Sequence, residues 1–320
     1  MTRDARYRQG ALERIRQLHE RADPASDRLA WNQYHDVLNG TAGIGLALLY
    51  TAREMEHAPS LALATKAGEA LLRQGQRANG GRYWTIGSDI DFNVPNFSHG
   101  TGGVGYFLAT LYAATGRMAF LDGARAAATY LQAVAKTEGG VFLVPYGIPN
   151  DGFDMPYDIG WAHGPAGTAR LFYRLWQVTG EQAWLEVVHA SARGLLASGV
   201  PDAPAHAGFG EAPFRRDMRF GTAGAEAFLL DLYATTDEAP YLTAAERIVD
   251  DLIGAAQVDS TGLRWRLPRY GFQGNEGTLT AFTGYYYGAS GLGGLMLRMH
   301  TTRHYTAPPF VLPDNPFFSP

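Results

Sequence analysis

The apolar positions of this chain gather in five long runs, and each run follows the same short glycine motif. The motif is a residue X, then Gly, a mostly small pair and a second Gly. The X residues are Asn39, His99, His163, Phe220 and Tyr287. The first glycines fall at 40, 100, 164, 221 and 288. The spacing is about 60 residues, which matches one helical hairpin plus a loop in a repeat protein.

The segments that follow the five motifs are apolar on all sides, so we predict five helices that are fully buried. Segments with one apolar face lie between them, at 120–136, 183–196 and 241–255. These are predicted to form an outer layer. The glycines are expected to allow close approach of a neighbouring helix. The pattern predicts an all-α fold, an α/α toroid with a ring of inner helices inside a ring of outer ones. An ordinary α-solenoid with glycine-rich turns is the alternative.

The segments outside the helices predict a few local features. Residues 141–146 and 262–268 are rich in apolar and aromatic residues and predict short β-hairpins in loops. We expect one toroidal domain over residues 1–306. Residues 307–320 form a proline-rich tail, which we expect to be a strap on the surface.

Composition narrows the classes of function. Hydrophobic residues make up 46% of the chain and charged residues 18%, which favours a large core. A net charge of -4 with scattered basic residues argues against nucleic-acid binding. The absence of cysteine excludes thiolate metal sites and a cysteine nucleophile. The first residues carry no signal peptide, and no window reaches the roughly 18 apolar residues of a membrane span. We expect a cytoplasmic protein.

Two of the motifs have distinctive flanks, SHGTGG at 98–103 and GWAHGPAG at 160–167. Five glycine motifs in register with these flanks resemble the lanthionine synthetase C-like family over residues 34–299. The resemblance implies the toroidal fold and a cyclase activity. Family cyclases add a cysteine thiol of a precursor peptide to a dehydroamino acid, and a zinc ion held by two Cys and one His activates the thiol.

The resemblance also implies that the zinc ligands are missing here. The family's ligand positions correspond to Ala162, Arg219 and Phe220. An Arg that assists catalysis in the family corresponds to Asp158. Two functional positions of the family are retained, an Asp at Asp36 and a catalytic His at His99. Some family members without zinc ligands occur as domains of kinase–cyclase fusion enzymes.

In a toroid, the five X residues are expected to face one end of a central cavity, near the positive ends of the inner-helix dipoles. An imidazole there can act as a general base, and a carboxylate can orient it. We therefore expect catalytic roles for His99, Asp36 and His163. We expect substrate binding by Arg219, Asp158, Trp161, Tyr286 and Tyr287, with Arg219 stabilising a developing enolate or a substrate carboxylate. Each of these residues can instead serve packing or turn structure alone.

The favoured function is a zinc-independent, lanthionine-synthetase-like cyclase or tailoring enzyme in peptide natural-product biosynthesis. It would add a thiol or another nucleophile to a dehydroamino acid within one molecule and so close a ring. No cofactor is expected. Candidate partners are a precursor peptide or a small natural-product intermediate, together with the kinase or lyase enzymes that carry out dehydration.

Three alternatives remain open from the sequence. The chain can be a non-catalytic pseudo-cyclase that binds a precursor peptide or a partner enzyme. It can be a carbohydrate-active toroid, for which the Asp-x-Asp of residues 89–91 and the aromatic Trp84 offer weak support. His99, His163 and Asp158 together can form a different metal site.

Overall fold

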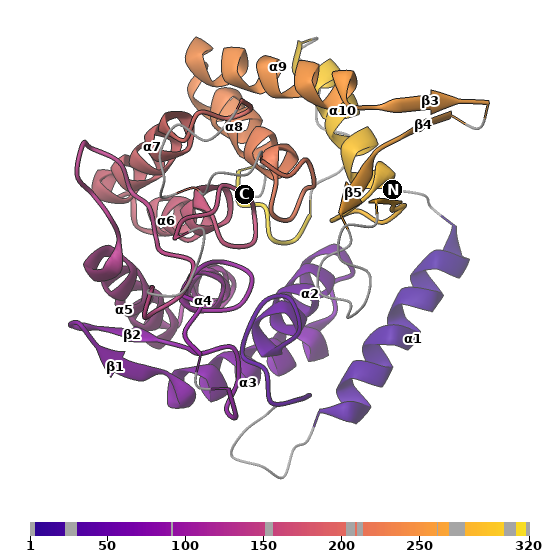
Figure 1. Cartoon of the computed structure of the whole chain (residues 1–320). Helices are drawn as coiled ribbons and strands as arrows, with labels where there is room; N and C mark the ends of the chain where they lie inside the picture. The colour runs from indigo at the N-terminus through magenta and orange to yellow at the C-terminus, as the bar shows by residue number, and fades with distance from the viewer. Residues whose placement is uncertain are drawn as a thin grey trace. The chain divides into compact units, whose positions relative to one another are not determined.

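The computed structural model of the chain describes residues 4–22, 31–90, 92–150, 156–202, 209, 214–260, 262–268, 279–303 and 312–317 (Figure 1). The chain divides into two compact units. The first comprises residues 1–133 with 174–180, and the second comprises 134–173 with 181–320.

The first unit is built from helices and one hairpin. Its elements are α1 (Ala5–Arg21), α2 (Thr41–Glu54), α3 (Ala58–Gln74), β1 (Gln76–Ala78), β2 (Gly81–Tyr83), α4 (Thr101–Thr115) and most of α5 (Met118–Val134). Helices α2, α3 and α4 pack on one another. Helix α1 has a single buried residue, Ile15, among those described, so it contributes little to the core.

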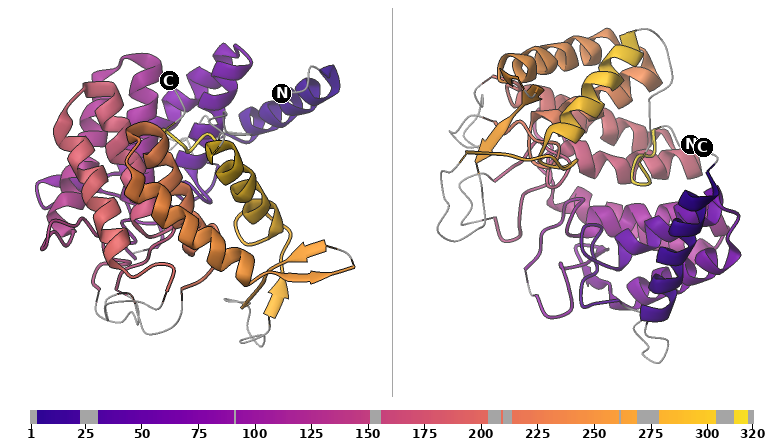
Figure 2. Two further views of the ribbon diagram at one scale, coloured as in Figure 1. Left: turned by 90° about the horizontal axis from the view of Figure 1, so that it is seen from above. Right: turned by 90° about the vertical axis from the view of Figure 1, so that its right-hand side faces the viewer.

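The second unit repeats the same plan with two more hairpins. Its elements are α6 (Pro165–Thr179), whose last residues from Arg174 belong to the first unit, α7 (Gln182–Ala197), α8 (Thr222–Thr236), α9 (Ala239–Gly254), β3 (Gln257–Asp259), β4 (Gly262–Arg264), β5 (Arg266–Pro268), β6 (Leu279–Ala281) and α10 (Ala289–Arg303). Strands pair antiparallel as β3–β4 and β5–β6. The β3–β4 hairpin extends away from α9 and α10 (Figure 2). Helix α8 packs on both α9 and α10.

The five predicted inner helices are α2, α4, α6, α8 and α10, and each begins directly after the first glycine of its motif. A turn over the three residues before that glycine leads into every one of them. Helix α8 is buried from Thr222 to Leu232 without interruption, as expected for a helix that is apolar on all sides. The predicted outer helices at 120–136, 183–196 and 241–255 are α5, α7 and α9, with ends shifted by one or two residues. The positions of these inner and outer helices are confirmed. Full burial of all five inner helices is wrong, because Leu297 on α10 is 58% exposed and Ala47 on α2 is exposed as well.

The reason for the glycines differs from our expectation. A Cβ on Gly40, Gly100 or Gly288 would overlap with the backbone of the chain about six residues earlier, and not with a neighbouring helix. The same holds for the second glycines: a Cβ on Gly43 would meet the carbonyl oxygen of Val37, and one on Gly291 that of Tyr285. Each motif is therefore tightly folded on itself, and the glycines make the turn possible.

The hairpin predictions are half correct. Residues 262–268 contribute strands β4 and β5, as expected. Residues 141–146 form no strand, and Leu143 makes only an isolated bridge with Lys136. We did not predict the β1–β2 hairpin, although its turn residues Asn79 and Gly80 both have positive φ, 49° and 76°, and Asn-Gly is a strong hairpin signal.

The expectation of a surface strap at the C-terminus is wrong for the part of the tail that the structure describes. In residues 312–317, Asp314 is 9% exposed and Phe317 is 6% exposed. The remainder of the predicted tail, 307–311 and 318–320, lies outside the described residues. Within the described chain, no helix has the length and apolar character needed to cross a membrane.

Candidate functional site

His99 and Asp36 form a hydrogen-bonded pair in the first unit. His99 Nδ1 lies 2.7 Å from Asp36 Oδ2, and the Asp36 side chain is fully buried while that of His99 is 15% exposed. Each residue lies in the turn that precedes an inner helix, His99 before α4 and Asp36 before α2. The other carboxylate oxygen of Asp36 accepts a hydrogen bond from the Asn39 backbone N–H at 2.7 Å, which holds the carboxylate in place.

This arrangement determines how the imidazole can act. A carboxylate accepts hydrogen bonds, so Nδ1 of His99 carries the proton that is shared with Asp36. In the neutral form of His99 the lone pair then lies on Nε2, which is the atom able to take a proton from a substrate. A carboxylate that fixes the tautomer and orientation of a histidine base is a recurring element of enzyme active sites.

Asp36 also has a structural counterpart in the fourth repeat, Asp217. Both lie three residues before X. Asp217 Oδ1 accepts hydrogen bonds from the backbone N–H groups of Arg219 and Phe220 at 3.0 and 2.7 Å, and Oδ2 pairs with Arg215 at 2.7 Å. The shared part of the two arrangements is the closure of the turn. Of these two aspartates, only Asp36 holds a histidine with its second oxygen.

His163 lies in the second unit in aromatic surroundings. It is 2% exposed, and its ring lies against Tyr146 with centroids 4.3 Å apart. On another side it stacks on Phe220 at 5.5 Å and 16°. Burial raises the pKa of the Tyr146 hydroxyl, so this group remains a proton donor at neutral pH. Sequence reasoning did not single out Tyr146.

Arg219 is held by the aromatic residues of the fourth and fifth repeats. Its Nη1 donates a hydrogen bond to the Tyr287 hydroxyl at 2.6 Å. Its guanidinium lies 4.6 Å from the ring centroid of Phe220 and 5.7 Å from that of Tyr287, within the range of cation–π attraction. Arg219, Phe220 and His163 therefore form one cationic and aromatic cluster. The role of Arg219 toward an enolate or carboxylate stays a prediction.

Asp158 is buried, and its carboxylate binds its own turn. Oδ1 accepts hydrogen bonds from the backbone N–H groups of Ile159 and Gly160 at 2.5 and 3.0 Å. Burial raises the pKa of Asp158 from 3.8 to about 7, and the nearby Asp217 adds to this effect. Asp36 therefore bonds an imidazole, that of His99, as we expected of a carboxylate at this end of the helices. The hydrogen bonds of Asp158 go to backbone N–H groups instead.

We predict a pH-dependent stabilisation by Asp158→Asn. Between pH 4 and pH 7 the folded chain keeps a proton on Asp158 that the unfolded chain has lost, so this group makes stability fall as pH rises through that window. The amide oxygen of Asn can accept the same two hydrogen bonds and has no charge. The variant should therefore gain on the order of 2 kcal/mol more over the natural chain at pH 8 than at pH 5.

Denaturant unfolding at the two pH values measures this difference. A gain that is equal at pH 5 and pH 8 would contradict the raised pKa of Asp158.

The residues at the positions that the resemblance assigns to zinc ligands do not fit a metal ion. Ala162 has no donor atom, Phe220 has none, and Arg219 carries a permanent positive charge. The imidazole of His163 packs against two aromatic rings, those of Tyr146 and Phe220. In the described part of the chain, no group of three or more His, Asp or Glu side chains could hold a metal ion. The alternative site from His99, His163 and Asp158 would combine residues of both units, and it stays a prediction.

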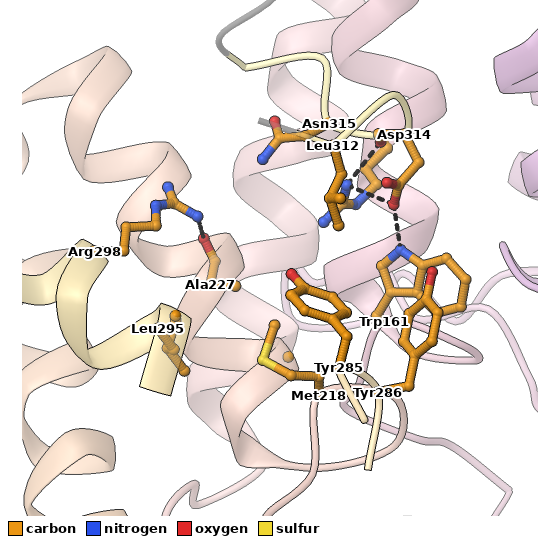
Figure 3. Close-up of a pocket in the computed structure, with 13 residues that line it drawn as sticks. Trp161, Met218, Ala227, Tyr285, Tyr286, Leu295, Arg298, Leu312, Asp314 and Asn315 are labelled. Atoms are coloured by element: carbon orange, nitrogen blue, oxygen red, sulfur yellow. Dashed lines mark hydrogen bonds and ion pairs between the residues drawn. The ribbon is translucent and has the colours of Figure 1, made fainter. Parts of the chain in front are cut away.

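A pocket lies in the second unit between α8, α10 and the C-terminal segment (Figure 3). Its empty volume, counted out to its mouth, is about 640 Å³. Trp161 and Tyr286 line it with ring centroids 4.8 Å apart. Burial raises the pKa of the Tyr285 hydroxyl to about 12, and it raises that of Tyr286 as well. Two of the predicted substrate-binding residues therefore share one pocket.

Sequence reasoning missed the polar residues that surround this pocket. Arg170 and Arg298 line it from α6 and α10, and Asp314 lines it from the C-terminal segment. The signal available was the presence of two arginines, Arg170 and Arg174, in a helix that was predicted to be buried. The Asp-x-Asp of the carbohydrate interpretation gives no comparable site, because Asp89 is exposed and Asp91 lies outside the described residues.

Comparison with solved structures finds several proteins of similar fold. A family 76 glycoside hydrolase from a bovine Bacteroides thetaiotaomicron strain matches with a TM-score of 0.58 and 15% identity, over 92% of this chain and 64% of its own. This chain therefore spans less than two thirds of that enzyme. Cellobiose 2-epimerase from Bacillus thermoamylovorans matches with a TM-score of 0.61 and 11% identity, over 93% of this chain and 81% of its own.

The unsaturated glucuronyl hydrolase of Bacillus sp. GL1 matches with a TM-score of 0.55 and 19% identity, over 82% of this chain and 74% of its own. At these identities the likeness establishes the fold alone, and it confirms the predicted α/α toroid. A comparison with curated proteins finds no match.

The family model for lanthionine synthetase C-like proteins matches residues 3–205, more than half of the 320 residues. The chain therefore belongs to the lanthionine synthetase C-like family.

Proposed function

We propose that this protein is a zinc-independent cyclase or tailoring enzyme that adds a thiol, or a similar nucleophile, to a dehydroamino acid of a peptide. The observation that carries the proposal is the hydrogen bond between His99 Nδ1 and the buried Asp36 carboxylate at 2.7 Å. It provides a base of fixed tautomer in a family member that has no metal ligand at Ala162, Arg219 or Phe220. The substrate would be a dehydrated precursor peptide or a related natural-product intermediate.

The reaction needs one base and no other reagent. His99 Nε2 takes the proton of the thiol, the sulfur bonds to Cβ of the dehydroamino acid, and the electron pair of the C=C bond moves toward the adjacent carbonyl. The imidazolium returns the proton to Cα, so the product has the same composition as the reactant. Ionising a thiol of pKa near 8.5 at pH 7 takes roughly 2 kcal/mol, and a positioned base contributes about 10² to 10⁴ in rate.

A specific observation favours a second candidate, a pseudo-cyclase that binds a peptide or partner enzyme without chemistry. The C-terminal segment 312–317 lines the pocket of the second unit beside Trp161 and Tyr286. A pocket partly filled by the chain itself suits binding and exchange of a segment. The carbohydrate-active alternative has support from the fold of its structural neighbours alone.

A synthetic peptide with one dehydroalanine and one cysteine tests the proposal. Ring closure leaves the mass unchanged and removes the thiol from reaction with iodoacetamide, so mass spectrometry after alkylation measures it. We expect the chain to close the ring faster than the spontaneous reaction. Binding of the peptide without acceleration would favour the pseudo-cyclase. If neither binding nor acceleration occurs, the cyclase and the peptide-binding pseudo-cyclase are both contradicted.

A further inference from the structure

The C-terminal segment 312–317 is held in the second unit by contacts that resemble those of a bound peptide. Its sequence is Leu-Pro-Asp-Asn-Pro-Phe. The two prolines restrict the backbone, which lowers the entropy that the segment loses on binding. The segment crosses one edge of the pocket, and Leu312, Asp314 and Asn315 are among the lining residues (Figure 3).

The first anchor is the carboxylate of Asp314. Its Oδ2 accepts hydrogen bonds from Trp161 Nε1 at 2.7 Å and from Arg170 Nη1 at 3.1 Å. Arg170 Nη1 also donates to the backbone oxygen of Asp314 at 2.7 Å. The side chains of Arg170 and Asp314 are 8% and 12% exposed, so this ion pair is largely shielded from water. Charge-assisted hydrogen bonds of this kind are strong and select for a carboxylate.

The second anchor is the ring of Phe317, three residues further on. It lies 4.1 Å from the ring centroid of Tyr173 and 6.0 Å from that of Phe228. Between the two anchors, the Asn315 side-chain amide donates to both oxygens of Asp231 at 3.1 and 3.3 Å. The second unit therefore contacts both an acidic residue of the segment, Asp314, and the aromatic residue three positions later, Phe317.

The composition of the receiving surface is that of a recognition site. Trp, Tyr and Arg are the residues most enriched at the energetic centres of interfaces, and Trp161, Arg170 and Tyr173 provide them here. The pocket continues beyond the segment along Tyr285, Tyr286 and Leu295.

We propose that the surface formed by Trp161, Arg170, Tyr173 and Phe228 is a docking site for a peptide that carries an acidic residue and, three positions later, an aromatic one. Segment 312–317 is an in-chain ligand that occupies the site and exchanges with such a peptide. Identifying this peptide as the precursor peptide rests on the proposed function. The binding itself does not require catalysis.

The proposal makes the in-chain segment a competitor. A tethered segment acts at an effective concentration in the millimolar range, so a free peptide binds the natural chain weakly. Weakening both anchors should free the site. We therefore expect the full chain with Asp314→Ala and Phe317→Ala to bind a fluorescent hexapeptide of sequence LPDNPF at least tenfold more tightly than the natural chain does.

Fluorescence anisotropy with changed peptides tests the recognition. Replacing the Asp of the peptide with Asn, or its Phe with Ala, should weaken binding at least tenfold, and so should Arg170→Gln in the protein. A peptide that shares only the Asp-x-x-Phe spacing should bind within about tenfold of the hexapeptide. Equal binding of all peptides, no binding, or binding of the natural sequence alone would overturn the proposal.

A second measurement covers the case in which the doubly substituted chain does not fold. The chain has no cysteine, so Pro316→Cys introduces a single thiol at a buried position of the segment. We expect millimolar hexapeptide to accelerate the reaction of this thiol with a disulfide reagent severalfold. The peptide in which Asn replaces the Asp should have no such effect. A thiol whose reaction rate neither peptide changes would show that the segment is a fixed part of the core, and the proposal would be wrong. A failure of either test leaves the ring-closure assay unaffected.

Discussion

Replacing His99 with alanine is expected to reduce the rate of ring closure by a factor of about 10² to 10⁴, the contribution of a positioned general base. The imidazole is oriented by the buried carboxylate of Asp36 at 2.7 Å, and alanine removes the base that takes the thiol proton. The alkylation assay with the dehydroalanine peptide measures the change. Because α4 begins at Thr101 and His99 lies before it in the turn, circular dichroism should remain that of the natural chain.

His189→Ala is the matched control for this prediction. His189 lies on α7, and its Nδ1 is 2.9 Å from the hydroxyl of Tyr241 on α9, so its role is to join two outer helices. The substitution should leave the rate of ring closure within about twofold of the natural chain. An unchanged rate in the His99→Ala chain would remove His99 from the mechanism.

Gly291→Ala is expected to destabilise the chain by about 3 kcal/mol or more, among the largest effects of a single substitution. A Cβ at this position would overlap with the backbone carbonyl oxygen of Tyr285 and with Met218 Cγ, and the carbonyl belongs to the turn that begins α10. The turn must therefore open or the helix must shift. The midpoint of thermal unfolding should fall by about 4 °C or more.

Gly293→Ala, two residues further along α10, provides the control. No atom outside the local backbone lies within 4 Å of a Cβ placed at Gly293, and alanine favours the helix over glycine by about 1 kcal/mol. The midpoint should rise slightly. If both substitutions lowered the midpoint equally, overlap with the closed turn would not be the cause of the loss at Gly291.

The repeats made most of the fold predictable from the sequence. Each inner helix starts directly after a glycine that the turn requires, so the motif marks the start of the helix in the sequence itself. The apolar character of the following residues then predicts burial on all sides, as α8 has from Thr222 to Leu232. These are local signals, and they occur five times.

The polar contacts between distant residues were less predictable. Asp36, which holds His99, could be named as a functional residue because a family resemblance pointed to it, although it lies 63 residues earlier in the chain. No such guide existed for Asp314, whose partners Arg170 and Trp161 lie 144 and 153 residues away. A proline-rich tail has the composition of a surface segment, and only the arginines of a helix predicted to be buried, Arg170 and Arg174, indicated that acidic partners were needed.

The central claim is that the His99–Asp36 pair replaces zinc in activating the nucleophile, and ring closure by metal-free protein tests it most directly. The chain is treated with a chelator, its metal content is measured, and the rate with the dehydroalanine peptide is recorded before and after addition of zinc. The account predicts the same rate for the untreated chain, for the chelator-treated chain and for the treated chain after addition of zinc. A rate that disappears on chelation and returns with zinc would contradict it.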